Sequence, residues 1–376
     1  MIAYLTLGEK YSGIFSGQVL DVCHLLNEQT AKDVVLISFI SLRNFKKEKR
    51  KIKDAYQNSI VLPQFPKLKN WYYNIILLFF VSIFKKYDTF ICRNCIPATL
   101  GLILKRKAII KNVVLDGRGA EYEQYIEYNM LSDNKLEEKL KHVESNAVNN
   151  VDFRIAVSEK LVDYWRNTFN YYKDDHVVIP CSLNRNHENL ESKKISRKDI
   201  GLKKSDVVLV YCGSISGWQS FSKMFKFVKS QILQNKDIKV LLLTKELDEI
   251  KLLMNEFPGR IICKWCSEKD VLPLMELGDY GLIIRDNTMT NKVASPVKFA
   301  EYLYAGLKVV ISEEIGDCSS FILEYNCGIL DNKIDKGLNK PSNEEKTFFR
   351  DLATNKFSKS HTMINSKYKL LLKKIR

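Results

Sequence analysis

The residues best suited to chemistry lie in one stretch of the sequence, residues 285–306. Ser295 is a good N-cap residue and Pro296 a good first helical residue, so we predict a helix over residues 296–305. The N-terminus of a helix that follows a parallel strand favours an anion, because backbone N–H groups and the helix dipole face it. Lys298 lies in the first turn, where a cation opposes the dipole unless an anion sits in front of it.

Glu301 follows Lys298 by three residues, which puts both side chains on one face of the helix, about 4.5 Å apart along its axis. This step roughly matches the one from a nucleotide phosphate to its ribose hydroxyls. A carboxylate accepts hydrogen bonds from vicinal hydroxyls, and a lysine holds phosphate charge. Arg285, at the end of the preceding strand, is placed to bind the same phosphates. The alternative is a surface ion pair between Lys298 and Glu301 on an ordinary helix.

Alternating strand and helix patterns predict an α/β protein with parallel sheets, and 376 residues suit two domains better than one. We predict a first domain at residues 1–181 and a second at 182–345, joined by a polar segment at 180–191. Residues 346–376 form a C-terminal helical segment whose last helix could pack back on the first domain. The strands are expected at residues 2–6, 34–39, 89–92, 108–115, 153–157, 177–179, 207–211, 239–244, 260–264, 281–285 and 308–312, whereas residues 41–75 fit no clear pattern.

The second half carries a specific motif within this pattern. It reads Ser295-Pro296-x-Lys298-x-x-Glu301-Tyr302-x-x-x-Gly306-x-x-Val309-Val310. This motif resembles the nucleotide-sugar signature of glycosyltransferase family 4, a retaining family with the GT-B fold, in which two Rossmann-like domains face a cleft. Weaker matches to the family occur earlier in the chain, in the order that the family has them. They are the N-terminal glycine loop, Val157-Ser158, Ile179-Pro180 and Tyr211-Cys-Gly213-Ser214. The resemblance implies transfer of a sugar from a nucleotide-sugar that the second domain binds.

The sequence departs from the family in two places. The family motif has two glutamates with seven residues between them, and Glu301 matches the second, but Val293 stands where the first contacts the transferred sugar. The family also often places an arginine and a lysine after the first strand of this domain. The loop here reads Gly213-Ser-Ile-Ser-Gly-Trp-Gln and has no basic residue, so Trp218 and Ser214 are expected to contact the donor instead.

The charge that this loop lacks would then come from Arg285. The resemblance also implies that the loop around Trp265 lies under the nucleobase, although Trp265 could equally be a core residue. The residues expected to bind the donor are Gly213, Ser214, Trp218, Trp265, Cys266, Asn291, Ser295, Pro296, Lys298 and Glu301.

A second candidate turn, Asp116-Gly-Arg118-Gly119, follows a strand of the first half and precedes a helix. Glycines let a backbone approach a ligand, so Asp116 and Arg118 are expected to face the cleft. Together with Arg285 and Lys298 they are the predicted catalytic residues. The alternative is a local turn with an internal ion pair. The residues expected to contact the acceptor are Gly13, Gly119 and Glu121.

The expected chemistry is glycosyl transfer without a metal or another cofactor, because no Asp-x-Asp pair occurs in the sequence. Negative charge builds on the leaving diphosphate as the glycosidic bond breaks, and Lys298, Arg285 and the helix N-terminus would stabilise it. An alternative keeps the fold without the activity, as a nucleotide-sugar-binding partner of another transferase. Val293 in place of a glutamate favours that alternative.

The formal net charge of +15 predicts an anionic partner, either a nucleic acid or a membrane face. The first half combines basic clusters at residues 46–53, 85–86 and 105–107 with an apolar stretch at 71–84. That stretch is too short to span a bilayer, which takes about 20 residues. It is either a helix packed on the sheet, which we favour, or an interfacial anchor.

No common nucleic-acid motif occurs in the sequence, so we expect a glycan or lipid-linked acceptor and no nucleic acid. Its nine cysteines show no disulfide or metal spacing, and no signal peptide is present. We therefore expect a cytoplasmic protein, peripheral on the inner face of the membrane if it reaches a lipid-borne acceptor. Assembly of a surface polysaccharide, such as lipopolysaccharide or capsule, is the role that the family suggests.

Overall fold

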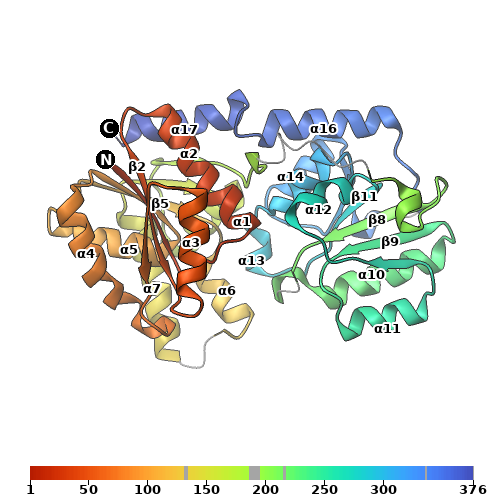
Figure 1. Ribbon diagram of the computed structural model, residues 1–376, viewed down its shortest axis with the longest axis horizontal. Helices are drawn as coiled ribbons and strands as arrows, with labels where there is room; N and C mark the ends of the chain where they lie inside the picture. The colour runs from red at the N-terminus through yellow and green to blue at the C-terminus, as the bar shows by residue number, and fades with distance from the viewer. Residues whose placement is uncertain (131–133, 186–194, 215–216, 335–336, 376) are drawn as a thin grey trace. The chain divides into compact units, whose positions relative to one another are not determined.

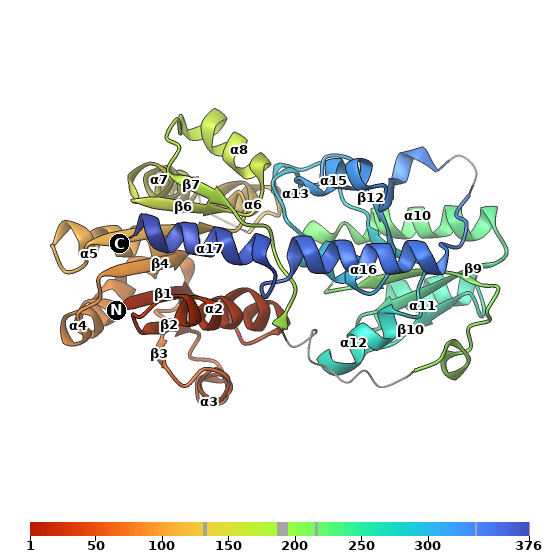
Figure 2. The ribbon, with the colours of Figure 1, turned by 90° about the horizontal axis from the view of Figure 1, so that it is seen from above.

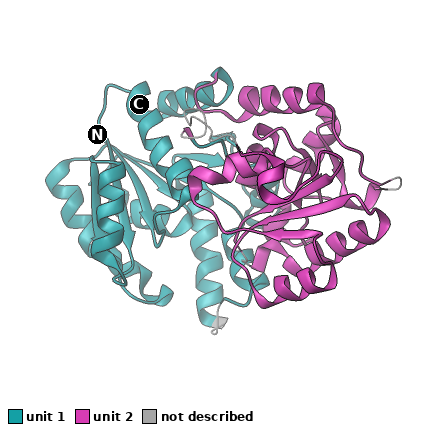
Figure 3. Ribbon diagram, turned by 45° about the vertical axis from the view of Figure 1, so that its right-hand side comes forward, with its two compact units in different colours: residues 1–184, 362–376 teal, residues 185–361 magenta. Residues whose placement is uncertain are grey.

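The computed structural model describes residues 1–130, 134–185, 195–214, 217–334 and 337–375. The chain divides into two compact units, which Figure 3 shows in different colours. Unit 1 comprises Met1–Asn184 with Thr362–Arg376, and unit 2 comprises Arg185–His361. Much of the polar segment expected at 180–191 lies outside the described residues.

Unit 1 is built on a seven-stranded sheet in the order β3-β2-β1-β4-β5-β6-β7, with every neighbouring pair parallel (Figure 1). Helices α2, α3 and α17 cover one face of this sheet, and α4, α5 and α7 cover the other (Figures 1 and 2). Its strands are β1 (Ile2–Leu7), β2 (Val34–Ile40), β3 (Ser59–Pro63), β4 (Thr89–Arg93), β5 (Asn112–Gly117), β6 (Phe153–Ala156) and β7 (His176–Val178). Its helices are α1 (Gly13–Phe15), a π-helix (Ser16–Leu20), α2 (Asp21–Gln29), α3 (Phe45–Ala55), η2 (Leu68–Tyr73), α4 (Asn74–Lys85), α5 (Cys95–Arg106), α6 (Glu121–Glu127), α7 (Asn134–Asn150), α8 (Glu159–Phe169) and α17 (Thr362–Lys374).

Unit 2 contains a six-stranded parallel sheet in the order β10-β9-β8-β11-β12-β13. The strand order reverses between β8 and β11, so the carboxyl ends of these two strands flank the switch point where ligands bind in open α/β sheets. The strands are β8 (Val207–Cys212), β9 (Ile238–Leu243), β10 (Ile261–Cys263), β11 (Tyr280–Ile283), β12 (Lys308–Ile311) and β13 (Gly328–Leu330). The helices are η3 (Arg197–Ile200), η4 (Gly217–Gln219), α10 (Phe221–Gln234), α11 (Asp248–Glu256), α12 (Glu268–Met275), α13 (Met289–Lys292), α14 (Val297–Tyr304), α15 (Cys318–Tyr325), η5 (Asp331–Lys333) and α16 (Asn343–Phe357).

The predicted α/β class with two parallel sheets is confirmed, and the strands explain why it could be predicted. Parallel strands are covered on both faces and therefore consist of nearly continuous apolar runs, as in β2, which is buried along its whole length. Two strands were missed: β3 in the stretch that fitted no pattern, and the three-residue β13. The strand predicted from residue 108 begins only at Asn112, because Ala108, at a φ of 56°, belongs to the turn that ends α5.

The segment predicted at residues 346–376 is divided between the two units. Helix α16 packs on α14 of unit 2, whereas α17 packs on α2 and β7 of unit 1. Residues 182–184 stay with unit 1, because the Gln18 side chain donates to the carbonyl of Ser182 at 2.6 Å. The division after Asn184 therefore replaces the predicted one after residue 181.

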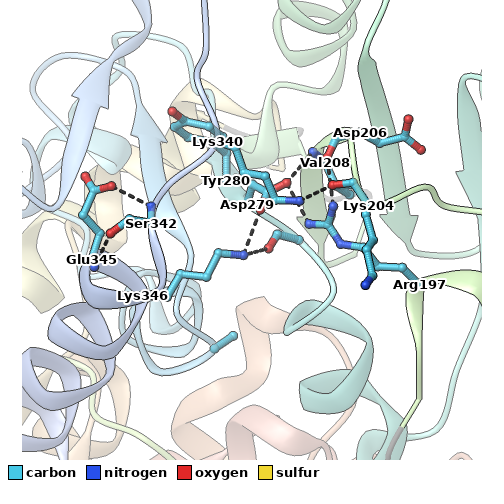
Figure 4. A network of polar contacts seen from close by, with 12 residues as sticks. Arg197, Lys204, Asp206, Val208, Asp279, Tyr280, Lys340, Ser342, Glu345 and Lys346 are labelled. Carbon is cyan, nitrogen blue, oxygen red and sulfur yellow. Dashed lines mark hydrogen bonds and ion pairs between the residues drawn. The ribbon is translucent and has the colours of Figure 1, made fainter.

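Asp279 ties three parts of unit 2 together at the amino ends of β8 and β11 (Figure 4). Its fully buried carboxylate accepts from Arg197 Nη2 of η3 at 2.8 Å and from the Val208 backbone N–H at 3.0 Å. Its other oxygen accepts from Lys346 Nζ of α16 at 2.8 Å. The negative charge of one acid thus compensates the positive charges of two side chains, one near each end of the unit's sequence.

Replacing Asp279 by asparagine removes the charge that compensates Arg197 and Lys346. We expect Asp279→Asn to lower the free energy of unfolding by about 3–5 kcal/mol, because breaking a buried pair leaves buried charge unpaired. Equilibrium urea unfolding measures the change. Asp248→Asn is the control, since Asp248 pairs with Lys251 at the surface with 91% of its side chain exposed, and should cost less than about 1 kcal/mol. Equal effects of the two substitutions would contradict this role.

Candidate functional site

Helix α14 starts one residue later than predicted, at Val297. Pro296, with a ψ of 122°, is in the extended region and is therefore the N-cap residue, so the prediction of Ser295 as N-cap and Pro296 as first helical residue is wrong. The other end is as predicted: Gly306, at a φ of 78°, follows the helix, and its N–H donates to Leu303 O. The helix amino end lies beside the strand-order reversal, as the anion-site hypothesis requires.

Lys298 and Glu301 lie on one face of α14, as predicted, and their side chains form an ion pair. The pair is not a surface pair, because only 29% of the Lys298 side chain and 9% of the Glu301 side chain are exposed. Burial lowers the pKa of Lys298, but the Glu301 carboxylate raises it, and the net shift is upward. Lys298 therefore carries a positive charge in the first turn of the helix, and the Glu301 carboxylate is its partner.

Tyr302 fixes α14 against both central strands. Its hydroxyl accepts from the backbone N–H of Cys212, the last residue of β8, at 2.8 Å. Its ring packs on Gly281 of β11, where a Cβ atom would lie 2.3 Å from the ring carbon Cγ. Only glycine allows this approach, so the position of α14 on the sheet is set by one residue from each strand.

Arg285 follows β11 and its side chain is buried, with 7% exposed. Its guanidinium donates to Asn291 Oδ1 at 3.4 Å and to Gln219 Oε1 at 3.2 Å. Asn291, predicted to bind the donor, is itself fully buried and donates to the carbonyl of Asp286 at 3.1 Å. The structure therefore makes Asn291 a support for Arg285, carried by the short helix α13 between the two predicted elements.

Several residues of this site were missed from the sequence. Lys223 Nζ donates to the Arg285 carbonyl at 2.7 Å and to Ser312 Oγ at 3.2 Å, and Ser312 in turn donates to Asp331 at 2.7 Å. The sequence could have indicated Lys223, because it lies in the first turn of α10. A cation at that position opposes the helix dipole, as Lys298 does in α14. Gln219 gave no such signal, because its contact with Arg285 spans 66 residues.

Of the predicted site residues, Arg285 and Lys298 border one small hollow at the carboxyl ends of β8 and β11. The side chains and backbone around it include Tyr211, Cys212, Gln219, Arg285, Lys298 and Tyr302. Arg285 and Lys298 approach it from two different elements. Two basic side chains beside one hollow, one of them from the first turn of a helix, favour a multiply charged anion such as a diphosphate.

The remaining predicted donor residues lie around this sheet edge with different environments. Trp265 is 66% exposed and Lys245 Nζ lies 5.4 Å from its ring, so the alternative of a core tryptophan is wrong. Cys266 is half-buried, and burial raises the pKa of its thiol to about 11. Ser214 and Gly213 lie in the loop after β8. The carbonyl of Ser214 accepts from the hydroxyl of Tyr211, a residue of β8, at 2.8 Å, and this hydroxyl lies next to Gly213. Trp218 lies in η4 and is half-buried.

Val293, which replaces the family's first glutamate, is buried with 1% exposed. The position therefore presents no polar group to a sugar. Ser295, two residues on, is half-buried and precedes the N-cap of α14.

In unit 1, Asp116 is not in a turn but within β5, where it is the centre of a buried network. Its carboxylate accepts a hydrogen bond from Tyr4 Oη and pairs with Arg118 at 3.3 Å and Arg93 at 3.7 Å. This is the internal ion pair that the sequence left as the alternative. Arg93, which ends β4 and also pairs with Glu9 at 2.8 Å, was not foreseen.

The three predicted acceptor residues lie in different settings within unit 1. Glu121 accepts from the backbone N–H of Cys95 at 2.7 Å and so caps α5. Gly119 borders open space, since a Cβ atom there would meet nothing within 4 Å. Gly13 is exposed at the first residue of α1, after the N-cap Ser12.

Among the described residues, no group of three or more histidine, cysteine, aspartate or glutamate side chains is arranged to hold a metal ion. In the same part of the chain, no helix has both the length and the apolar character that crossing a bilayer requires.

Comparison with solved structures relates this fold to known proteins. HepE of Anabaena, solved in complex with UDP, is similar with a TM-score of 0.70 and 13% identity over 99% of each chain. Sucrose-phosphate synthase from Thermosynechococcus elongatus has a TM-score of 0.70 and 13% identity, covering 100% of this chain and 98% of that chain. A glycosyltransferase from Rickettsia africae has a TM-score of 0.68 and 12% identity, covering 100% and 97%. No protein-family model and no curated protein matches the sequence.

The chain has the GT-B fold. In unit 2, Arg285 and Lys298 lie beside the carboxyl ends of β8 and β11, where the strand order reverses. In unit 1 the order reverses between β1 and β4; Arg93 ends β4, and Asp116 lies on the neighbouring strand β5.

A buried acid in unit 1 makes the free energy of unfolding depend on pH. Glu144 of α7 is 1% exposed and accepts from the backbone N–H groups of Glu121 at 3.2 Å and Tyr122 at 2.6 Å. Burial, together with the nearby Glu121 carboxylate, raises the pKa of Glu144 to about 8. The charged form of Glu144 is therefore disfavoured in the folded state.

Because the folded pKa lies above the unfolded value of about 4.3, the folded state loses stability as the pH rises from about 4.3 to about 8. We expect Glu144→Gln to flatten this part of the pH profile of the free energy of unfolding, measured by urea unfolding. Glu138→Gln, at an exposed position of the same helix, should leave the profile unchanged. A Glu144→Gln profile that parallels that of the wild type would contradict the assignment.

Proposed function

We propose that this protein transfers a sugar from a nucleoside-diphosphate sugar to a hydroxyl of a glycan or lipid-linked saccharide. The observation that carries the proposal is the convergence of Arg285 and Lys298, the latter from the first turn of α14, on one hollow of unit 2. The fold supports it, since HepE has been solved with UDP-glucose and resembles this chain with a TM-score of 0.68 and 14% identity.

The roles in this proposal follow from charge and position. Lys298 and Arg285 hold the diphosphate and stabilise the negative charge that builds on it as the glycosidic bond breaks. Glu301 accepts from the ribose hydroxyls, and Lys298 exchanges part of its interaction with Glu301 for the phosphate. Trp265, being exposed, offers a face for the nucleobase. In this proposal transfer needs no metal, because fixed cations already neutralise the leaving group. Retention is proposed from the resemblance of the 295–310 motif to a retaining family.

The acceptor side of the proposal rests on unit 1. Arg118 and Asp116 act as a charged pair at the carboxyl edge of its sheet, and Gly119, with open space above it, lets an acceptor approach the backbone. Gly13 and Glu121 are the further proposed acceptor residues. We place the protein in the cytoplasm, peripheral to the membrane, in the assembly of a surface polysaccharide such as lipopolysaccharide or capsule.

A second candidate function is a nucleotide-sugar-binding subunit that supports another transferase. The buried Val293 favours it, because no side chain replaces the glutamate that contacts the sugar in the family. Release of nucleoside diphosphate that depends on an added acceptor separates the two. Tight donor binding without such release would favour the binding subunit.

UDP should raise the melting temperature of the protein by mass action, and the dependence on concentration gives its affinity. We expect Lys298→Ala and Arg285→Ala each to weaken UDP binding by about 10- to 100-fold, because each removes a charge-assisted hydrogen bond to phosphate. Parallel titrations with ADP and GDP determine the preferred base.

Lys226→Ala is the matched control, since Lys226 is an exposed lysine on α10 of the same unit. Its affinity for nucleoside diphosphate should equal that of the wild type. The donor-site assignment fails if Lys298→Ala and Arg285→Ala bind as well as Lys226→Ala.

A further inference from the structure

Helix α4 of unit 1 presents an apolar stripe to solvent. Ile76, Phe80, Ile83 and Phe84 follow one another at helical spacing on one face and are 47–82% exposed. Two tyrosines of the preceding η2 extend the stripe at its amino end, Tyr72 and Tyr73, with 45% and 41% exposed.

The opposite face of α4 anchors the helix. Asn74, Leu78 and Ser82 are buried, at spacings of four residues. Asn74 accepts from the backbone N–H of Phe65 at 3.0 Å, which fixes the turn that leads into η2. Figures 1 and 2 show α4 on the outside of its helix layer, beside α5. One face of α4 thus makes the predicted packing contacts with the domain. The opposite face is exposed to solvent on a helix that is held in place.

Basic residues border the stripe at both ends. Lys67 and Lys69 precede it, Lys85 and Lys86 follow it, and all four are exposed. No aspartate or glutamate occurs between Asp54 and Asp88, so no acid within this segment compensates them. Apolar and aromatic side chains with lysines around them match a lipid surface that has an apolar interior and anionic headgroups.

A second copy of the chain fits this surface less well. In a symmetric dimer the same patch meets itself, which would bring the lysines of both copies together. An anionic membrane instead neutralises them while the aromatic side chains enter the headgroup boundary.

We propose that the α4 stripe, defined as Tyr72, Tyr73, Ile76, Phe80, Ile83 and Phe84, docks unit 1 on an anionic lipid surface. The four lysines bind the headgroups and the apolar side chains enter the interface. The stripe lies on unit 1, the unit to which the proposed function assigns the acceptor.

Cosedimentation of the full-length protein with lipid vesicles tests this docking. Wild-type protein should bind vesicles of phosphatidylglycerol mixed with phosphatidylcholine and bind phosphatidylcholine vesicles much more weakly. Phe80→Ser combined with Phe84→Ser should weaken binding at least about tenfold. The control combines Leu233→Ser with Leu252→Ser, which removes two exposed leucines of unit 2, and should bind like the wild type.

A second pair of variants tests the charged rim. Lys85→Gln with Lys86→Gln should weaken binding to anionic vesicles by about 10- to 30-fold, because each lysine near the surface adds to the attraction. The control, Lys226→Gln with Lys236→Gln, removes two exposed lysines of unit 2 and should have little effect.

The proposal is overturned if the wild type does not bind anionic vesicles, or if the stripe and control variants bind equally. A wild-type dimer that Phe80→Ser with Phe84→Ser converts to monomer, without vesicle binding, would assign the stripe to self-association instead. Vesicle binding needs no donor, and unchanged UDP affinity in the stripe variants separates a failure here from a failure of the proposed function.

Discussion

The positive charge of Lys298 in the first turn of α14 is the constraint on which the site depends. The helix dipole opposes a cation at that position, and burial removes the water that would otherwise solvate it. Glu301, one turn along the helix, compensates both effects in the absence of an anion. Tyr302 and Gly281 hold α14 on the sheet, and Lys298 lies beside the ends of β8 and β11, where the strand order reverses.

The second cation reaches the same hollow by a separate route. Arg285 leaves the end of β11, with its carbonyl bound by Lys223 and its guanidinium by Gln219 and Asn291. Two cations that are positioned by different elements of the fold suit the electrostatic stabilisation of a leaving group, because their positions are set before the reaction. This arrangement of charge supports the proposed transfer from an activated sugar, whereas the fold alone does not determine the reaction, because similar folds host different chemistries.

Patterns in the sequence predicted those strands and helix ends that are determined by residues close together in the chain. Strands such as β8 were found because both of their faces are buried, and the end of α14 was found because Gly306 can adopt a positive φ. Helix α3 was missed because only Ile52 is buried in a run rich in lysine, so no apolar periodicity marks it. The supports of Arg285 and the Arg93–Asp116 pair join residues far apart in the sequence, and spacing carries no information about such contacts.

The most direct test of the donor site is a crystal structure of the protein with UDP bound. We expect the diphosphate at the amino end of α14, with phosphate oxygens within about 3.2 Å of Lys298 Nζ and of the Arg285 guanidinium. Glu301 should accept from the ribose hydroxyls. UDP bound elsewhere on the chain, with this hollow empty and the Lys298–Glu301 pair unchanged, would contradict the account.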